Sequence, residues 1–185
     1  NVKIAYHQHV RYRLFDAGTL APLTDELTLA ACPAAEGDVS LAPFASGWAA
    51  AWRAGWEHVD GSELETIEVE APAPSAHWSV GPHLPGPAGD HPALVPLDDS
   101  RLLLFYTVGT DPEATTVANV GRLHWVVLDT AGSPSLEGLP ITFTADGSTD
   151  DPTVAHSQPA AARAGNHLLL SWRSAPVSAD PGAED

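Results

Sequence analysis

Histidine and carboxylate side chains recur at equivalent positions in this sequence, at the start of strand-like runs. His91 and His156 stand there in two runs, and Asp38 takes the matching place in the run before them. Imidazole and carboxylate groups are ligands that zinc and related transition metals accept when a fold brings three of them together. These three residues are therefore a candidate metal site. Histidines on polar segments are more often exposed or hydrogen-bonded, so a region without metal is the preferred interpretation.

A second candidate ion site lies in the segment ADGSTDDP. Asp146, Ser148 and Asp150 alternate there, as the oxygen ligands do in the first half of a calcium loop. The sixth position holds Asp151 rather than Gly, and the twelfth holds Ser157 rather than Glu, which excludes an EF-hand. A solvated acidic turn is the preferred interpretation. We predict no cofactor, and Ca²⁺ is the one ion that stays open.

Carboxylates also gather in two long connections between predicted strands, where paired carboxylates could support hydrolysis. Two arginines follow an aromatic residue at a strand end, from which a guanidinium can stack on the ring or hold a carboxylate. The candidate ligand-binding residues are Arg53, Glu57, His58, Asp60, Asp111, Glu113 and Arg173. The sequence contains no phosphate-binding loop, dinucleotide fingerprint, nucleophile elbow or haem attachment motif, so it assigns no catalytic residue.

A repeat in the sequence predicts how these candidates are positioned. Similar apolar segments end in an aromatic residue four times: VKIAY at Tyr6, WAAAW at Trp52, LLLFY at Tyr106 and LLLSW at Trp172. The aromatic residues are 46, 54 and 66 residues apart. A recurring segment at such spacing is typical of an array of small sheets, with the additional residues placed in one connection.

Each of the last three segments is the second strand of a predicted hairpin. Short turns rich in Gly, Asn, Asp and Ser join two β-prone runs, which is the usual hairpin signal. The paired runs are 38–44 with 47–53, 91–97 with 101–106, and 158–163 with 167–172. GWAAAWRAGW also fits an amphipathic helix, because Trp48, Trp52 and Trp56 are four residues apart. Its alignment with the other hairpins favours a strand.

Two further strands belong to each predicted unit. The third strands are 10–15, 65–70 and 122–128, and the fourth strands are 26–30, 77–80 and 140–144. Polar and apolar residues alternate in VRYRLF and ETIEVE, so we expect their polar side chains to face solvent. The predicted array is a single domain with units at about 2–44, 45–97 and 98–163, a partial unit at 164–174, and a tail or cut loop at 175–185.

Four-stranded antiparallel units of this length resemble the blades of a β-propeller. The segments HPALVPLDDSRLLLFY and QPAAARAGNHLLLSW resemble the propeller-type repeats of large exported bacterial proteins. The resemblance implies an all-β fold of about three four-stranded antiparallel blades with incomplete units at both ends. It also implies an extracellular or periplasmic location in a bacterium. The sialidase-type Asp box and the WD and kelch signatures are absent from the sequence.

Charge and composition exclude several classes of function. Eight Lys and Arg against 24 Asp and Glu give a net charge of −16, which repels the phosphates of nucleic acids and anionic lipids. No apolar run reaches the roughly 18 residues that a membrane span requires. A single cysteine, Cys32, rules out an internal disulfide and multi-cysteine zinc motifs. The sequence has no Met and begins with Asn1, so we expect a processed or excised piece of a longer protein.

The expected function is that of a non-catalytic scaffold or binding module, which presents loops on one face of a propeller. The alternative is part of a propeller-type glycan hydrolase or lyase with carboxylate catalysis. We expect the connections 54–64 and 108–121 to lie on the loop face. About three blades cannot close a ring, which typically takes about four to eight, so other polypeptide chains or pieces of the same precursor are expected to complete it. Closure by two copies fits poorly, because 2–6 and 167–172 would give one blade two second strands.

Overall fold

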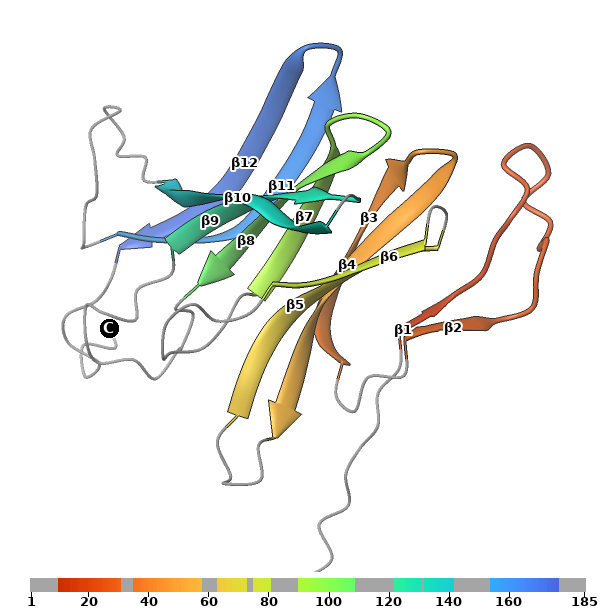
Figure 1. The fold of residues 1–185 in the computed structure, drawn as a ribbon, viewed down its shortest axis with the longest axis horizontal. Coiled ribbons are helices and arrows are strands. Elements are labelled where there is room, and N and C mark those ends of the chain that lie inside the picture. Colours follow the sequence, from red (N-terminus) through yellow and green to blue (C-terminus); the bar gives the residue numbers. More distant parts are fainter. Residues whose placement is uncertain are drawn as a thin grey trace, which may run out of the picture.

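The structure is a computed structural model of the 185-residue chain. It describes residues 10–30, 35–57, 63–72, 75–80, 90–108, 122–130, 132–141 and 154–176. All helical or strand elements within these ranges are β-strands (Figure 1). In chain order they are β1 (Val10–Tyr12), β2 (Leu27–Ala30), β3 (Ala35–Phe44), β4 (Gly47–Glu57), β5 (Glu63–Pro72), β6 (Ser75–Val80), β7 (Asp90–Pro96), β8 (Arg101–Val108), β9 (Arg122–Asp129), β10 (Gly132–Ile141), β11 (Val154–Ala164) and β12 (His167–Pro176).

The strands form antiparallel sheets in which neighbours along the chain are also neighbours in space. Two sheets have four strands, in the orders β3-β4-β5-β6 and β7-β8-β9-β10, and the pairs β1-β2 and β11-β12 form two-stranded sheets. The predicted all-β class is confirmed. GWAAAWRAGW lies in β4, which pairs with a strand on each side, so its interpretation as a strand is also confirmed. Tertiary pairing here overrides the helix propensity of the alanines.

Several strand boundaries differ from the prediction. β4 continues to Glu57 and β5 begins at Glu63, so the connection predicted at 54–64 is shorter, and β12 extends into the predicted tail at 175–185. The largest difference is at β10. β10 begins at Gly132 rather than at Pro140, because the chain turns tightly after Asp129 and pairs with β9 at once. Pro134 has no amide to donate to the ladder, and the register shifts between Gly132 and Leu136. A sequence that contains proline and glycine is therefore compatible with a strand at the edge of the sheet.

The sheets stand side by side, with the first strands of successive hairpins next to each other. β7 packs against β3 on one side and against β11 on the other (Figure 1). The outermost strands β6 and β10 touch only slightly. The sheets therefore splay apart from their first strands toward their fourth strands, which curves the stack around the first strands.

Three hydrophobic layers alternate with the sheets. The first lies between β1-β2 and β4, the second between the two four-stranded sheets, and the third between β7-β8-β9 and the β11-β12 hairpin. The period of two along β4 lets one strand serve two layers: Ala50 and Trp52 belong to the first, and Ala49 and Ala51 to the second. Apolar residues therefore cover both faces of the inner strand β4.

The pairing register relates the three hairpins residue by residue. The pairs one step before the last pair of each hairpin correspond to one another: Pro43 with Trp48, Pro96 with Leu102, and Arg163 with Leu168. Counted from these pairs, Trp52, Tyr106 and Trp172 take the same place on the second strands, as the sequence predicts. Tyr6, the fourth aromatic residue of the repeat, lies outside the described residues.

Equivalent positions differ in exposure between the middle and the ends of the stack. Leu41 of β3 is 67% exposed, whereas Leu94, in the same place on β7, is 5% exposed. Leu169 of β12 is 70% exposed, and its counterpart on β8, Leu103, is 7% exposed. Leu94 packs toward the preceding sheet and Leu103 toward the following one. Each end of the described stack thus presents an apolar surface of the kind that is buried in its middle.

Candidate functional site

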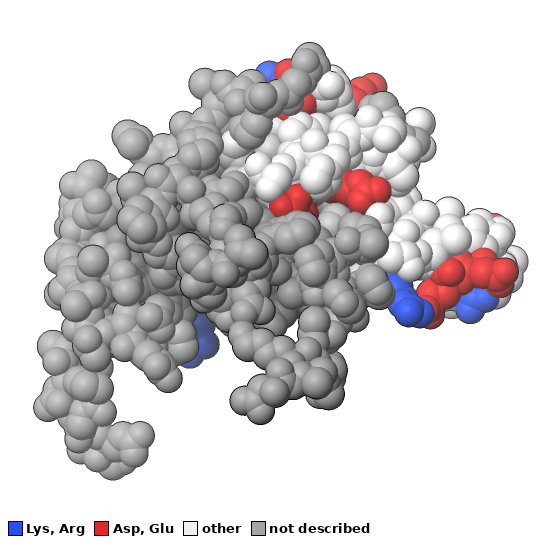
Figure 2. Space-filling model, turned by 60° about the horizontal axis from the view of Figure 1, so that its bottom comes forward, with Lys and Arg blue, Asp and Glu red and all other residues white. Residues whose placement is uncertain are grey.

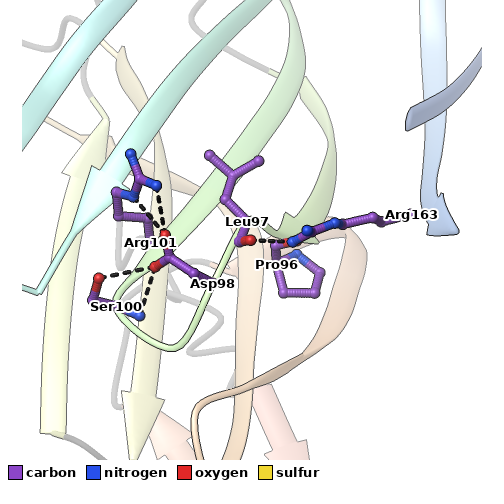
Figure 3. Close-up of polar contacts among 6 residues, drawn as sticks. All are labelled: Pro96, Leu97, Asp98, Ser100, Arg101 and Arg163. Atoms are coloured by element: carbon purple, nitrogen blue, oxygen red, sulfur yellow. Dashed lines mark hydrogen bonds and ion pairs between the residues drawn. The ribbon is translucent and has the colours of Figure 1, made fainter. Parts of the chain in front are cut away.

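One of the polar contacts at the hairpin turns links two sheets (Figure 3). Arg163, near the end of β11, donates hydrogen bonds to the backbone carbonyls of Leu97 and, at 3.3 Å, Pro96 in the neighbouring hairpin. Its Nε donates to the carbonyl of Gly165 at 2.8 Å. A planar guanidinium has several donors in fixed directions, which suits such simultaneous contacts. Arg163 therefore ties the β11-β12 hairpin to the β7-β8 hairpin.

Within the β7-β8 turn, Asp98 accepts four hydrogen bonds (Figure 3). Arg101 donates from Nε at 2.8 Å and from Nη2 at 2.6 Å, and Ser100 donates from its amide and its hydroxyl, both at 2.9 Å. The Arg101 guanidinium, with the Ser100 donors, holds the pKa of the Asp98 carboxyl well below its usual range. The carboxylate is engaged within its own turn, so its role is structural.

Two further hydrogen bonds join the four-stranded sheets to each other. The amide of Leu94 on β7 donates to Ser40 Oγ on β3 at 3.0 Å. The Nε1 of Trp78 on β6 donates to the carbonyl of Asp129, at the end of β9, at 3.1 Å. One bond lies between first strands and the other between outer strands. Together with the apolar layer between them, they fix the position of one sheet on the next.

A buried carboxylate lies on the outer strands β5 and β6. Glu68 is 4% exposed, accepts a hydrogen bond from Ser79 Oγ at 2.8 Å, and lies 2.8 Å from His77 Nε2. Burial raises the pKa of neighbouring Glu70, an effect that His77 opposes. We expected the polar side chains of ETIEVE to face solvent, and for Glu68 that expectation is wrong. Its partners Ser79 and His77 satisfy the carboxylate, which makes its burial tolerable.

An apolar groove of about 260 Å³ lies between the β1-β2 hairpin and the β3-β4 hairpin. Tyr12 and Trp48 meet there edge to face, with ring centroids 4.8 Å apart and an interplanar angle of 61°. Its lining residues are Tyr12, Arg13, Leu14, Leu41, Ala42, Pro43 and Trp48. The Nε of Arg13 donates to the carbonyl of Thr24 at 2.8 Å, so the guanidinium is held by its own hairpin. Exposed apolar grooves of this kind mark surfaces that bind other molecules.

The sequence alone does not reveal this groove. Trp48 reads there only as part of the apolar segment before Trp52, and Tyr12 only as part of an alternating strand. β1 ends at Tyr12 rather than at residue 15, because beyond it the strand ladder is reduced to an isolated bridge between Phe15 and Pro22. The signal that was present is the period of two, which puts Trp48 on the same face of β4 as Trp52.

The predicted metal ligands lie in the first halves of β3, β7 and β11, which are the first strands of the three hairpins. Each of these strands has a register shift there, between 35 and 39, 90 and 93, and 157 and 160. His91 has a φ of 51°, and Gln158, its counterpart by register, has a φ of 52°. His156 lies two residues earlier, opposite Ser174. The side chains of Asp38 and His156 lie outside the described part, so their metal site stays a prediction.

Few of the other predicted site residues can be placed. Arg53 is half-buried on β4, Glu57 is the last residue of β4, and Arg173 is exposed on β12. The remaining candidates lie outside the described residues: His58, Asp60, Asp111, Glu113, Asp146, Ser148 and Asp150. Among the residues that the structure does describe, no three His, Cys, Asp or Glu side chains are grouped so that they could hold a metal ion.

β4 and β8 both end on the side of the molecule at the bottom of Figure 1. β3 and β7 begin on that side, because they pair antiparallel with β4 and β8. Figure 2 turns this side toward the viewer, and the described surface that shows there is largely uncharged, with several acidic and a few basic groups. The connections 58–62 and 109–121, which leave from these strand ends, lie outside the described ranges.

Comparisons of the chain with protein-family models, with curated proteins and with solved structures found no match. In the described ranges, no helix is long and apolar enough to cross a membrane. The described surfaces are thus the basis for a functional assignment.

Proposed function

We propose that the chain is a non-catalytic scaffold or binding module of β-propeller type in a multi-chain assembly, located in the extracellular or periplasmic space of a bacterium. One observation carries this proposal: Leu94 is 5% exposed in the middle of the stack, and its counterpart Leu41 is 67% exposed at the end. In a repeat architecture each unit buries its neighbour's apolar face, and an end that is to stay soluble needs a polar surface. The apolar ends therefore call for further sheets as neighbours.

The arrangement of the sheets supports propeller blades in particular. Both four-stranded sheets are antiparallel meanders, and their first strands β3 and β7 lie next to each other. The fourth strands β6 and β10 stand farther apart. Propellers place the first strand of each blade at the central axis and splay the outer strands, which is the same relation. The location in an exported protein rests on the resemblance of the repeat segments.

Three of the described carboxylates support a scaffold rather than a glycan hydrolase. Asp98 holds the β7-β8 turn, and Glu68 is buried against Ser79 and His77. Asp16 accepts hydrogen bonds from Gly18 and Thr19 in the loop between β1 and β2. A hydrolase needs two carboxylates that face a substrate, whereas these three are each occupied by their own strand or turn.

Hydroxyl-radical footprinting with mass spectrometry tests this proposal on the protein isolated from its natural source. We expect Leu41 and Leu169 to be protected as strongly as Leu94 and Leu103, because further sheets cover them in the assembly. Leu20, which is 75% exposed in the loop between β1 and β2, is the reactive reference. Reactivity of Leu41 and Leu169 equal to that of Leu20 would show that the ends of the stack are open, and would overturn the proposal.

A further inference from the structure

We propose that the polypeptide covering the two ends is a second copy of this chain, and that two copies close one ring of six sheets. Each copy would supply its two four-stranded sheets, and the β1-β2 pair of one copy would extend the β11-β12 pair of the other. This inference rests on the proposed function and names the partner. A six-sheet ring falls within the range of about four to eight blades that closed propellers have.

The two incomplete sheets supply complementary strands. Val10 on β1 and Leu29 on β2 share a hydrophobic cluster with Ala50 and Trp52 of β4. The third and fourth strands of the next sheet, β5 and β6, share a cluster with Leu104 of β8 in the same way. β1 and β2 therefore stand in the places of third and fourth strands. β11 and β12 are a first and a second strand, so the two pairs make one four-stranded sheet.

The open faces of the stack are also complementary. The uncovered side of β3 carries Val39 and Leu41, which are 48% and 67% exposed. The same side of β7 is covered by the preceding sheet. The uncovered side of β11 and β12 carries Ala160, Ala162 and Leu169, whereas the same side of β7 and β8 is covered by the following sheet. Each end of the stack thus presents one half of an interface, and that interface already exists twice between sheets within the chain.

The groove beside Trp48 lies where the partner's hairpin would enter. It is bounded by β1-β2 on one side and by β3 on the other, which are the elements that a β11-β12 pair from a second copy would contact. The residues that face it are apolar apart from Arg13, although the chain carries a net charge of −16. Because the groove carries no acidic group, a second acidic copy can approach it without repulsion between carboxylates. The contact is head to tail, and two such contacts close a ring when the rotation between copies permits it.

Residues 2–6 bear on the place beside β1 that the partner's β12 would occupy. The sequence predicts a second strand there, which would compete with β12 of the partner for one place. They lie outside the described residues, and the described strands alone add up to complete sheets in a pair of chains. In the proposed dimer, β12 of the second copy lies beside β1.

Light scattering of the full chain, with two variants and their mixture, tests the inference. We expect a particle of twice the 19.3 kDa chain mass, and monomers for Leu41→Asp and for Leu169→Asp. A 1:1 mixture of the two variants should recover dimers. In a mixed dimer, one of the two contacts joins the intact Leu41 of one copy to the intact Leu169 of the other. Leu20→Asp, at the loop between β1 and β2, is the matched control and should stay dimeric. Tryptophan fluorescence of each variant checks that the stack remains folded.

The outcomes separate this inference from the proposed function. A wild-type monomer, a dimer that persists in both aspartate variants, or a mixture that stays monomeric would each overturn pairing with a second copy. If Leu41 and Leu169 are nevertheless protected in the native protein by a different polypeptide, the proposed function stands and only the identity of the partner changes. Salt supplies an independent measure: screening of two negatively charged copies should strengthen the dimer as ionic strength rises from low values.

Discussion

The amide of Leu94 donates a hydrogen bond to the hydroxyl of Ser40, 3.0 Å away, across the boundary between two sheets. Leu94 is buried, so water cannot easily replace the hydroxyl. We expect Ser40→Ala to lower the free energy of unfolding by about 1 to 2 kcal/mol, the usual cost of a buried donor left without an acceptor. Chemical denaturation measures this. Ser46→Ala, in the exposed β3-β4 turn, is the control and should change stability by less than about 0.5 kcal/mol.

Glu68 provides a second test of how polar groups support the stack. Its buried carboxylate accepts a hydrogen bond from Ser79 and lies against His77, so Glu68→Ala leaves both partners without their acceptor. We expect a loss of about 2 kcal/mol in the free energy of unfolding. Glu26→Ala breaks an exposed ion pair with Arg11 and should cost less than about 1 kcal/mol. Equal losses in the two variants would contradict a structural role for the burial of Glu68.

Asp98 predicts a pH dependence with a defined sign. Its pKa is lowered in the folded protein from an ordinary value of 3.8, mainly by hydrogen bonds from Arg101. A lowered folded pKa means that the contribution to stability is present above pH 3.8 and is lost as the pH falls through the folded pKa. Asp98→Asn should therefore be less stable than the wild type at neutral pH, and the difference should shrink in acid.

Chemical denaturation at pH 7, 4 and 2.5 measures the Asp98 effect. Asp99→Asn, at the next exposed position of the same turn, controls for the general effect of removing a negative charge. A difference between wild type and Asp98→Asn that grows as the pH falls would refute the assignment.

Much of the fold follows from the sequence because hairpin turns and the period of two are local signals. The turns Asp98 to Ser100 and Gly165 to Asn166 fixed the ends of four strands, and the register then aligned Trp52 with Tyr106. The predicted start of β10, at residue 140, was too late, because an edge strand with a register shift accepts Pro134. Local signals describe a strand, but they do not say whether it lies at an edge.

The candidate site was less predictable, since it depends on which faces meet. Glu68 reads as a solvent-facing residue in an alternating strand, and only the placement of Ser79 and His77 on the adjacent strand makes its burial tolerable. The groove between Tyr12 and Trp48 joins residues from two hairpins that the sequence does not relate. Exposure of Leu41 is likewise invisible in a repeat whose equivalent residue, Leu94, is buried.

Arg163 predicts a local effect rather than a global one. Its guanidinium bonds to the carbonyls of Leu97, Pro96 and Gly165, so it fixes the β11-β12 hairpin on the neighbouring one. Arg163→Lys keeps the charge but cannot reach several carbonyls with one planar group. We expect faster amide hydrogen exchange in β11 and β12, with exchange in β4 and β5 unchanged. Arg173→Lys, exposed on β12, is the matched control; if both variants changed exchange alike, the link would not depend on Arg163.

The hairpin turns predict opposite effects of adding and removing a methyl group. Gly165 has a φ of 59°, and a Cβ at this position would meet nothing within 4 Å. Any loss in Gly165→Ala therefore comes from the left-handed backbone itself, and should be about 1 kcal/mol. Ala45, in the β3-β4 turn, already has a φ of 48°, so Ala45→Gly removes that strain.

The gain in Ala45→Gly should be about 0.5 kcal/mol, because glycine also increases the entropy of the unfolded chain and offsets part of the relief. Ala164→Gly, at the end of β11 beside the same kind of turn, has no strain of this type to relieve and should lose about 0.5 to 1 kcal/mol. Thermal and chemical denaturation of the three variants would settle the sign of each effect. If Ala45→Gly destabilised the protein as much as Ala164→Gly, the turn at residue 45 would not be strained, and the left-handed conformation would cost nothing there.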